Sequence, residues 1–157
     1  MADAYIKIEG AEGESLTKGY EKWIAVESFS WGVSLPVSHA GIGGSAAGNS
    51  TASAFHITKK IDKSSAKLFD HCCRGIHFPT ATFQQLKSTG KGGVEAYLTY
   101  KFSDLMVESV QWASGGEEPH ESVALNFSKV EIEYKKQDAT GKLTVGSQVA
   151  YDFKAQR

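Results

Sequence analysis

The sequence predicts a mainly β fold in a single domain over residues 1–157, with one short helix and strands curved into a barrel or closed sandwich. Three observations lead to this prediction. Apolar and polar residues alternate with the period of a strand along most of the chain. Only the segment 62–76 has the period of a helix. The run from Glu121 to Lys136 alternates but changes phase midway, which is typical of a strand that bends or changes layer.

Runs with strand periodicity divide the chain into about eight or nine expected strands. In the first run Ile6 and Ile8 share one face, and in the third Phe55 and Ile57 do so. Glycine-containing turn signals separate most of the runs. The runs cover residues 5–9, 22–32, 54–60, 80–88, 95–102, 105–112, 121–136 and 148–155.

The phase change within residues 121–136 has two explanations. One extra residue near Ser128–Lys129 would form a β-bulge and return the apolar side chains to the core. Alternatively, the strand changes the layer against which it packs, as strands that wrap a barrel do. Both explanations place the same apolar residues in the core: Val123, Leu125, Phe127, Val130 and Ile132.

The single helix is expected at about residues 65–74. Ser64 or Ser65 can cap its start, because a hydroxyl accepts a hydrogen bond from an unpaired backbone N–H. Gly75 can end it in the left-handed conformation. An apolar face directed at the sheets includes Leu68, Phe69 and Cys72. The helix is therefore expected to lie across an open end or flank of the β structure.

The segment at about residues 36–52 is rich in Gly, Ala and Ser and shows no period and almost no charge. A structureless loop of this length is uncommon in a compact domain and is usually functional or disordered. We therefore expect a long surface loop here.

Composition excludes several classes of protein. The chain has 17 Lys and Arg against 18 Asp and Glu, a formal net charge of −1, which argues against binding to nucleic acid or to anionic membranes. No apolar run approaches the roughly 20 residues that span a bilayer. The start lacks the basic and apolar regions of a signal peptide, so we expect synthesis and folding in the cytoplasm. Cys72 and Cys73 are adjacent, which favours two reduced thiols over a strained bridge.

The sequence predicts no catalytic, cofactor-binding or metal site. His71, Cys72 and Cys73 are consecutive, so on a helix they diverge and cannot converge on one metal ion. The glycine-rich runs lack the spacing of a nucleophile elbow, a dinucleotide fingerprint or a P-loop, and none joins a strand to a helix. We therefore expect a protein that is not an enzyme.

Four blocks, in order along essentially the whole chain, resemble the Hcp (haemolysin-coregulated protein) family of bacterial type VI secretion. Residues 5–34, YIKIEGAEGESLTKGYEKWIAVESFSWGVS, resemble the start of that family, and residues 61–75, IDKSSAKLFDHCCRG, resemble its single helix. Residues 114–134, SGGEEPHESVALNFSKVEIEY, resemble its most recognisable block. Residues 151–157, YDFKAQR, resemble its ending, with Tyr151 and Phe153 in place of the more usual Trp and Leu.

The resemblance implies a β-barrel of two antiparallel-rich sheets with a flanking helix. It also implies a homo-hexameric ring, rings stacked into a hollow tube, a spike protein at the tip, a contractile sheath, and effector proteins held in the lumen. Such a protein leaves the cell through the type VI apparatus, without an N-terminal signal peptide.

A barrel of about eight strands is filled by its own side chains, so a passage must lie between copies joined head to tail. We place the ring or stacking contacts in the long loop, at His39, Ile42, Asn49 and Ser50. The alternative is a monomeric β-barrel that binds a small ligand or sugar on Trp23, Trp31 and Trp112.

Overall fold

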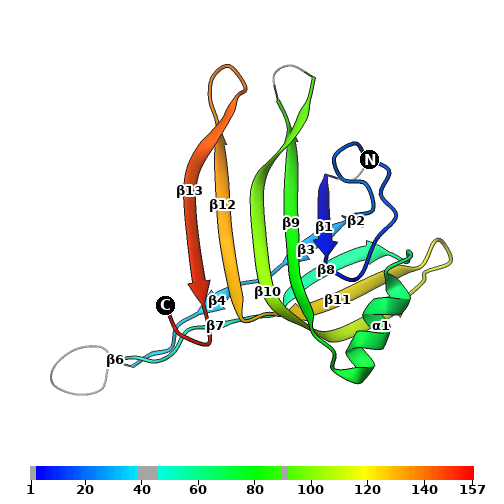
Figure 1. The fold of residues 1–157 in the computed structure, drawn as a ribbon, viewed down its shortest axis with the longest axis horizontal. Coiled ribbons are helices and arrows are strands. Elements are labelled where there is room, and N and C mark those ends of the chain that lie inside the picture. The colour runs from blue at the N-terminus through cyan, green and yellow to red at the C-terminus, as the bar shows by residue number, and fades with distance from the viewer. Residues whose placement is uncertain (1–2, 39–45, 90–91) are drawn as a thin grey trace.

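The fold is mainly β, with antiparallel strands and one helix, as the sequence predicts (Figure 1). The structure is a computed structural model that describes residues 3–38, 46–89 and 92–157. The helix is α1 (Ser65–Arg74). The strands of the main sheet are β1 (Ala4–Ile8), β2 (Ile24–Val26), β3 (Ser28–Ser30), β8 (Phe55–Lys60), β9 (Phe78–Ser88), β10 (Val94–Ala113), β11 (His120–Asn126), β12 (Lys129–Gln137) and β13 (Leu143–Asp152).

Strand β10 is shared by two layers. Its first part pairs with β9 and β12, and its last part, from Met106 onward, pairs with β11. Between the two parts Asp104 has a left-handed backbone, with φ of 58°. We call the layer of β2, β1, β9, β12, β13 and the first part of β10 layer A. The layer of β3, β8, β11 and the last part of β10 is layer B.

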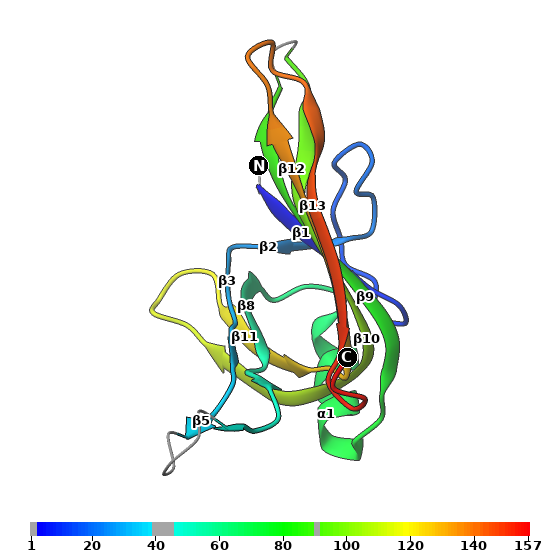
Figure 2. The same ribbon diagram turned by 90° about the vertical axis from the view of Figure 1, so that its left-hand side faces the viewer.

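The hydrogen-bonded strand order runs β2-β1-β9-β10-β11-β8-β3 and does not close into a complete barrel. The end strands β2 and β3 are joined by the single residue Glu27, whose backbone N–H donates to the carbonyl of Thr58 at 2.8 Å. The chain therefore crosses from layer A to layer B at Glu27 by bending, so no ladder is needed there. Figure 2 shows the long strands of layer A rising well beyond layer B.

The phase change in residues 121–136 marks a change of layer. Strand β11 ends at Asn126 in layer B and β12 starts at Lys129 in layer A. The intervening Ser128 donates its backbone N–H to the carbonyl of Ser103 at 3.1 Å, beside the point where β10 itself passes between layers. The bulge explanation is wrong at this place, and the layer-change explanation is confirmed.

The core lies between the two layers and is rich in aromatic rings. Trp31, Phe55, Phe102 and Phe127 contact one another with ring centroids 4.6–6.3 Å apart. Of the residues placed in the core from the sequence, Val123, Leu125, Phe127, Val130 and Leu68 are buried, whereas Ile132 and Cys72 are partly buried and pack against the core.

Phe69 is the exception, because its side chain is 50% exposed. It follows Leu68 on α1 and is turned about 100° from it around the helix axis. Only the stripe that contains Ser65, Leu68 and His71 is buried against the sheets. Phe69 instead stacks on Trp112 at the surface, with ring centroids 5.5 Å apart. Its assignment to the core is therefore wrong.

Helix α1 has the predicted bounds, and Gly75 ends it with φ of 67°, as expected. The helix starts where expected, but the expected capping bond is absent, because Ser64 makes no side-chain cap. Just before the helix, the carboxylate of Asp62 accepts the backbone N–H of Ser64 at 2.8 Å. The hydroxyl of Ser65 points inward and accepts the backbone N–H of Asp62 at 3.0 Å.

The expected loop at about residues 36–52 is a two-stranded ribbon in its described parts, so the prediction of a structureless loop is wrong for them. Strand β4 (Val33–Ser34) pairs with β7 (Thr51–Ala52), and β5 (Val37–Ser38) pairs with β6 (Ala46–Ala47). This ribbon projects away from both layers, toward the left of Figure 1. His39 and Ile42 lie outside the described residues.

Candidate functional site

Five hollows on the surface of the described residues are all partly open to solvent. Within residues 3–38, 46–89 and 92–157, no group of three His, Cys, Asp or Glu side chains could hold a metal ion. Every buried side-chain nitrogen or oxygen in these ranges has a hydrogen-bond partner. The candidate functional features are therefore surfaces.

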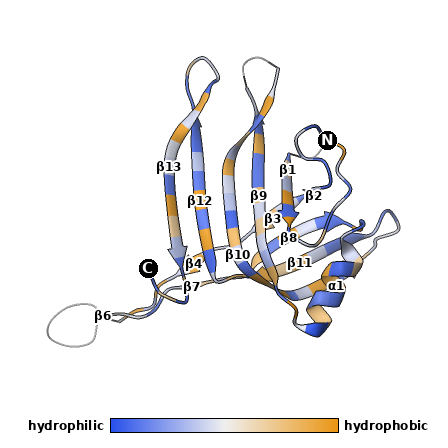
Figure 3. Ribbon diagram, in the orientation of Figure 1, coloured by the Kyte–Doolittle hydropathy of each residue, from blue (hydrophilic) through white to orange (hydrophobic). Residues whose placement is uncertain are grey.

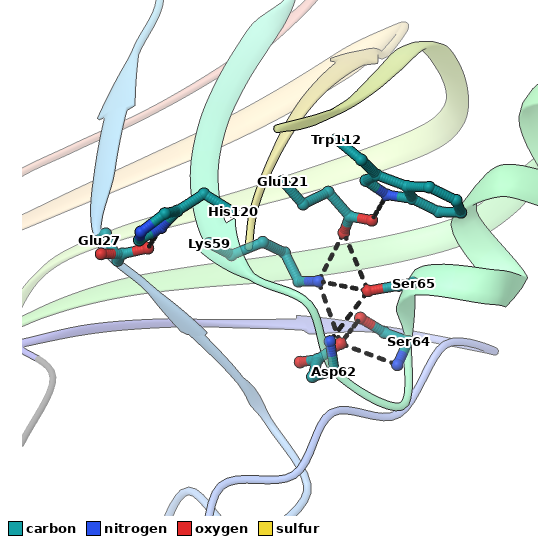
Figure 4. A network of polar contacts seen from close by, with 8 residues as sticks. All are labelled: Glu27, Lys59, Asp62, Ser64, Ser65, Trp112, His120 and Glu121. Carbon is teal, nitrogen blue, oxygen red and sulfur yellow. Dashed lines mark hydrogen bonds and ion pairs between the residues drawn. The ribbon is translucent and has the colours of Figure 1, made fainter. Parts of the chain in front are cut away.

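A buried charge cluster fastens α1 to layer B (Figure 4). Lys59 of β8 and Glu121 of β11 face each other across the ladder, with both side chains 0% exposed and their charged atoms 2.5 Å apart. The ammonium of Lys59 also contacts the carboxylate of Asp62 at 3.0 Å and the hydroxyl of Ser65 at 3.2 Å. The indole N–H of Trp112 donates to the second carboxylate oxygen of Glu121. The central pair, Lys59 and Glu121, lies away from solvent, so its role is to hold elements together.

Exposed polar contacts mark the two places where the chain passes between layers. Asp104, at the bend of β10, accepts hydrogen bonds from His77 at 2.7 Å and from Lys154 at 3.1 Å. The bond from His77, followed by that from Lys154, holds the pKa of Asp104 below its usual value. At the other crossing, His120 contacts Glu27 at 2.8 Å (Figure 4).

An apolar row crosses layer A and loses its cover toward the edge. The inward-facing residues paired in sequence across β1, β9, β10, β12 and β13 are Ile6, Phe83, Tyr100, Ile132 and Val149. The first two are 0% exposed, the next two are partly buried, and Val149 is 58% exposed. Figure 3 shows apolar and polar residues alternating along β12 and β13.

Layer B ends before it reaches the last strand, so the apolar face of layer A continues uncovered there. Tyr134, on the same face of β12, is 40% exposed. We call Ile132, Tyr134 and Val149 the edge patch. Strand β13 beside it pairs only with β12 among the described strands.

The opposite face of layer A is polar. Two cross-strand rows supply its side chains, and a shallow hollow runs along them. The hollow is lined chiefly by Gln84, Thr99, Lys101, Glu131, Glu133 and Gln148. A face of this kind is stable in water and needs no cover.

Part of the outward face of layer B is built from small, uncharged side chains. Two cross-strand rows there contain no Lys, Arg, Asp or Glu, whereas the next row, Ala113, His120 and Lys60, includes the 57% exposed Lys60. One row is Ser30, His56, Ala124 and Ser109, and the other is Ser28, Thr58, Ser122 and Gln111. A wide, open groove runs over most of these residues. We call this surface the serine face.

Two of the residues assigned to contacts from the sequence, His39 and Ile42, lie outside the described residues. Of the other two, Asn49 is exposed, whereas Ser50 is partly buried and bonded to Gln156 within the same chain. The sequence did not single out Gln156, Val149 or the serine face, because the role of each depends on residues of a neighbouring strand.

The three tryptophans do not form one binding platform. Trp31 packs into the aromatic core, Trp23 contacts Tyr20, and Trp112 lies beside α1. The shared surface on which the ligand-binding alternative depends is therefore missing.

Comparison with known proteins identifies the family. The sequence matches the family model described as "Type VI secretion system effector, Hcp" over residues 5–134. The chain belongs to the Hcp family. It is 38% identical over 141 residues to "Protein hcp1" of Pseudomonas aeruginosa strain PAO1, and the alignment covers 88% of this chain and 86% of that protein.

Solved Hcp structures share the fold. One described as a type six secretion system protein has a TM-score of 0.87 and 30% identity, covering 100% of this chain and 99% of that one. Hcp1 from Salmonella typhimurium has a TM-score of 0.78 and 31% identity, covering 99% of this chain and 97% of that one. The chain is thus a mainly β Hcp protein of type VI secretion.

In the part of the chain that the structure describes, no helix has the length and apolar character needed to cross a membrane.

Proposed function

We propose that this Hcp protein is a structural subunit of the type VI tube, forming hexameric rings that stack around a hollow lumen. The observation that carries the proposal is the uncovered end of the apolar row, where Val149 is 58% exposed although Phe83 in the same row is 0% exposed. The core between the two layers is packed with aromatic side chains. The passage therefore lies between copies, not within one.

A closed ring needs a head-to-tail contact, in which two different surfaces of each subunit meet. The edge patch supplies one apolar surface next to the free edge of β13, and unpaired edges of this kind readily accept another chain. A contact there buries apolar surface, and each Å² removed from water stabilises the contact by about 25 cal/mol. We assign the edge patch to the contact between neighbours in the ring.

The serine face suits the wall of a lumen. Its hydroxyls and amides are hydrated by water. Because its two rows carry no charged side chain, a protein of positive or negative net charge that passes along them is neither strongly attracted nor strongly repelled. The cargo is an effector protein held in the ring. The further partners are the spike protein at the tube tip and the contractile sheath, and export occurs through that apparatus.

The ribbon is the proposed contact between one ring and the next. It projects from the layers, and Val33, Leu35 and Val37 on it are 62%, 49% and 51% exposed. Three half-exposed apolar side chains on a projecting ribbon are typical of a surface that another molecule covers. The occupant in this proposal is a second copy of the chain in the adjacent ring.

The test is the assembly state of purified wild type, Val149→Lys and Leu16→Lys, by sedimentation and negative-stain microscopy. Wild type is expected as hexameric rings at tens of micromolar. Val149→Lys is expected to shift the protein toward monomer with an unchanged circular dichroism spectrum, because a charge would be buried in the contact. Leu16 is 93% exposed and lies away from the edge patch, so its Lys variant is the matched control. A monomeric wild type, or rings unaffected by Val149→Lys, would overturn the assignment.

A further inference from the structure

Gln156 joins the last turn of the described chain to the base of the ribbon. Its side-chain oxygen accepts hydrogen bonds from the backbone N–H of Ser50 at 2.8 Å, the hydroxyl of Ser50 at 3.1 Å and the hydroxyl of Tyr151 at 3.2 Å. Its side-chain nitrogen donates to the carbonyl of Ser50 at 3.0 Å and to that of Phe153 at 2.7 Å. We call this set of contacts the Gln156 clasp.

The side-chain amide of Gln156 binds the backbone of Ser50 in the way that a neighbouring strand does. One amide side chain binds both the N–H and the C=O of the same backbone residue, 106 positions away in sequence. Ser50 stands directly before β7, so the contact acts where one strand of the ribbon begins. The hydroxyl of Ser50 also contacts that of Tyr151, with the two oxygens 3.1 Å apart, and Tyr151 belongs to β13 of layer A.

The tail that carries Gln156 is itself held in place. The carboxylate of Asp152 accepts the backbone N–H groups of Lys154 at 2.9 Å and Ala155 at 3.2 Å. The ring of Phe153 contacts Phe127 of the core, with centroids 6.0 Å apart. Gln156 has a left-handed backbone, with φ of 57°, which turns its side chain back toward the ribbon. The clasp therefore connects the ribbon to a rigid base.

Apart from the packing of Trp31 and of Ala52 in β7 against the core, few contacts in the described chain tie the ribbon to the two layers. Its four short strands pair with one another and with no strand of the main sheet. At its base, Gly32 and Ser53 exchange backbone and side-chain bonds at 2.8 and 2.9 Å, but these bonds join the two sides of the ribbon to each other. The clasp instead ties the ribbon to the tail and to β13.

We propose that the Gln156 clasp is a positioning device, which sets the direction of the ribbon and thereby prepares it to contact a second copy of the chain in the next ring. The inference rests on the proposed function. Fixing a segment before it binds lowers the conformational entropy lost on binding, so a clasped ribbon joins rings more tightly than a free one with the same residues. Ring closure uses other surfaces and is independent of the clasp.

The test compares wild type with Gln156→Gly and Arg157→Gly. Glycine adopts positive φ without strain, so Gln156→Gly removes the amide but leaves the backbone turn available. Arg157 is the adjacent exposed residue and serves as the matched control. Ser50→Ala provides an independent variant, because it removes the hydroxyl bonds to Gln156 and Tyr151 and keeps the backbone bonds.

Two measurements are made on each variant. The hydrogen-exchange rate of the Ser50 backbone amide shows whether the clasp is formed, and it can be measured without ring assembly. We expect Gln156→Gly to accelerate this exchange by about tenfold, as the loss of one strong or two ordinary hydrogen bonds implies. Negative-stain microscopy, under crowding that makes wild-type rings stack, reports the number of rings per stack. We expect this number to fall several-fold for Gln156→Gly and less for Ser50→Ala, with hexamer mass unchanged.

The outcomes separate this inference from the proposed function. Unchanged Ser50 exchange in Gln156→Gly would overturn the clasp. Faster exchange with wild-type stacking would overturn its role in positioning, as would an equal loss of stacking in Arg157→Gly. If wild type formed no rings, the proposed tube would be wrong instead. The hydrogen-exchange rate of the Ser50 amide would still show whether the clasp holds Ser50.

Discussion

Replacing Lys59 with Met tests how strongly the buried charge cluster holds α1 and the strands of layer B. Met has a similar length and no charge, so most of the buried volume is kept while the cation is lost. The carboxylate of Glu121, 0% exposed and 2.5 Å from the ammonium of Lys59, then stays buried without a counter-charge. The hydroxyl of Ser65 and the indole of Trp112 still contact it, but neither neutralises it.

Removing one partner of a buried ion pair costs about 3–5 kcal/mol of the free energy of unfolding, because an uncompensated charge remains. The adjacent Lys60 is the matched control. It pairs with Glu118 at 3.2 Å, and the two side chains are 57% and 59% exposed. Exposed pairs contribute about 0–1 kcal/mol, so Lys60→Met is expected to lie in that range. The double variant Lys59→Met/Glu121→Leu is expected to be more stable than Lys59→Met alone, because it leaves no isolated charge.

The assay is urea unfolding followed by tryptophan fluorescence, with each free energy obtained by linear extrapolation. Unfolding is measured at two protein concentrations, since assembly adds a concentration-dependent stabilisation that must be the same in all variants. A loss below about 1 kcal/mol for Lys59→Met would refute the reasoning, because effects of that size are expected for exposed pairs. So would equal losses for the Lys59 and Lys60 variants.

Two further predictions concern packing. Phe127→Ala is expected to lower the free energy of unfolding by about 3–5 kcal/mol, whereas Phe69→Ala, at a half-exposed ring, lowers it by about 1 kcal/mol or less; equal losses in urea unfolding would contradict the core assignment. Gly13→Ala is expected to cost at least about 1–3 kcal/mol, because the new Cβ would lie 2.4 Å from the backbone oxygen of Trp23. Gly32 has nothing within 4 Å of a new Cβ, so its Ala variant should melt near the wild-type temperature, and matching melting temperatures for the two glycine variants would refute this account.

Local patterns in the sequence predict most of the elements of the fold. The bounds of α1 follow from its period and from Gly75, both of which act within a few residues. Alternation predicts where the strands lie, but it does not show which runs join into one strand. The expected strands at 95–102 and 105–112 form one strand, β10, because Asp104 adopts a left-handed backbone that carries the chain through the bend. Conversely, the run at 22–32 contains two strands, since Glu27 turns the chain between layers.

The ribbon and the surfaces depend on non-local pairing, which a single sequence does not display. Small residues form the ribbon without alternation, and its strands pair only with one another. Lys59 and Glu121 sit in segments whose polar residues mostly face water, and only the ladder between β8 and β11 brings them together under α1. Val149 has the alternation of a core residue, and its exposure follows from where layer B ends.

Strand β10, 20 residues long, belongs to both layers without a break. A force pushing on one end of the subunit therefore reaches the other end through peptide bonds, whereas two separate sheets would transmit it only through packed side chains. The ladders with β9 and β12 would be loaded in shear, so many hydrogen bonds must fail together before the strand slips. We therefore expect the subunit to resist a force applied along β10 without separation of its two layers.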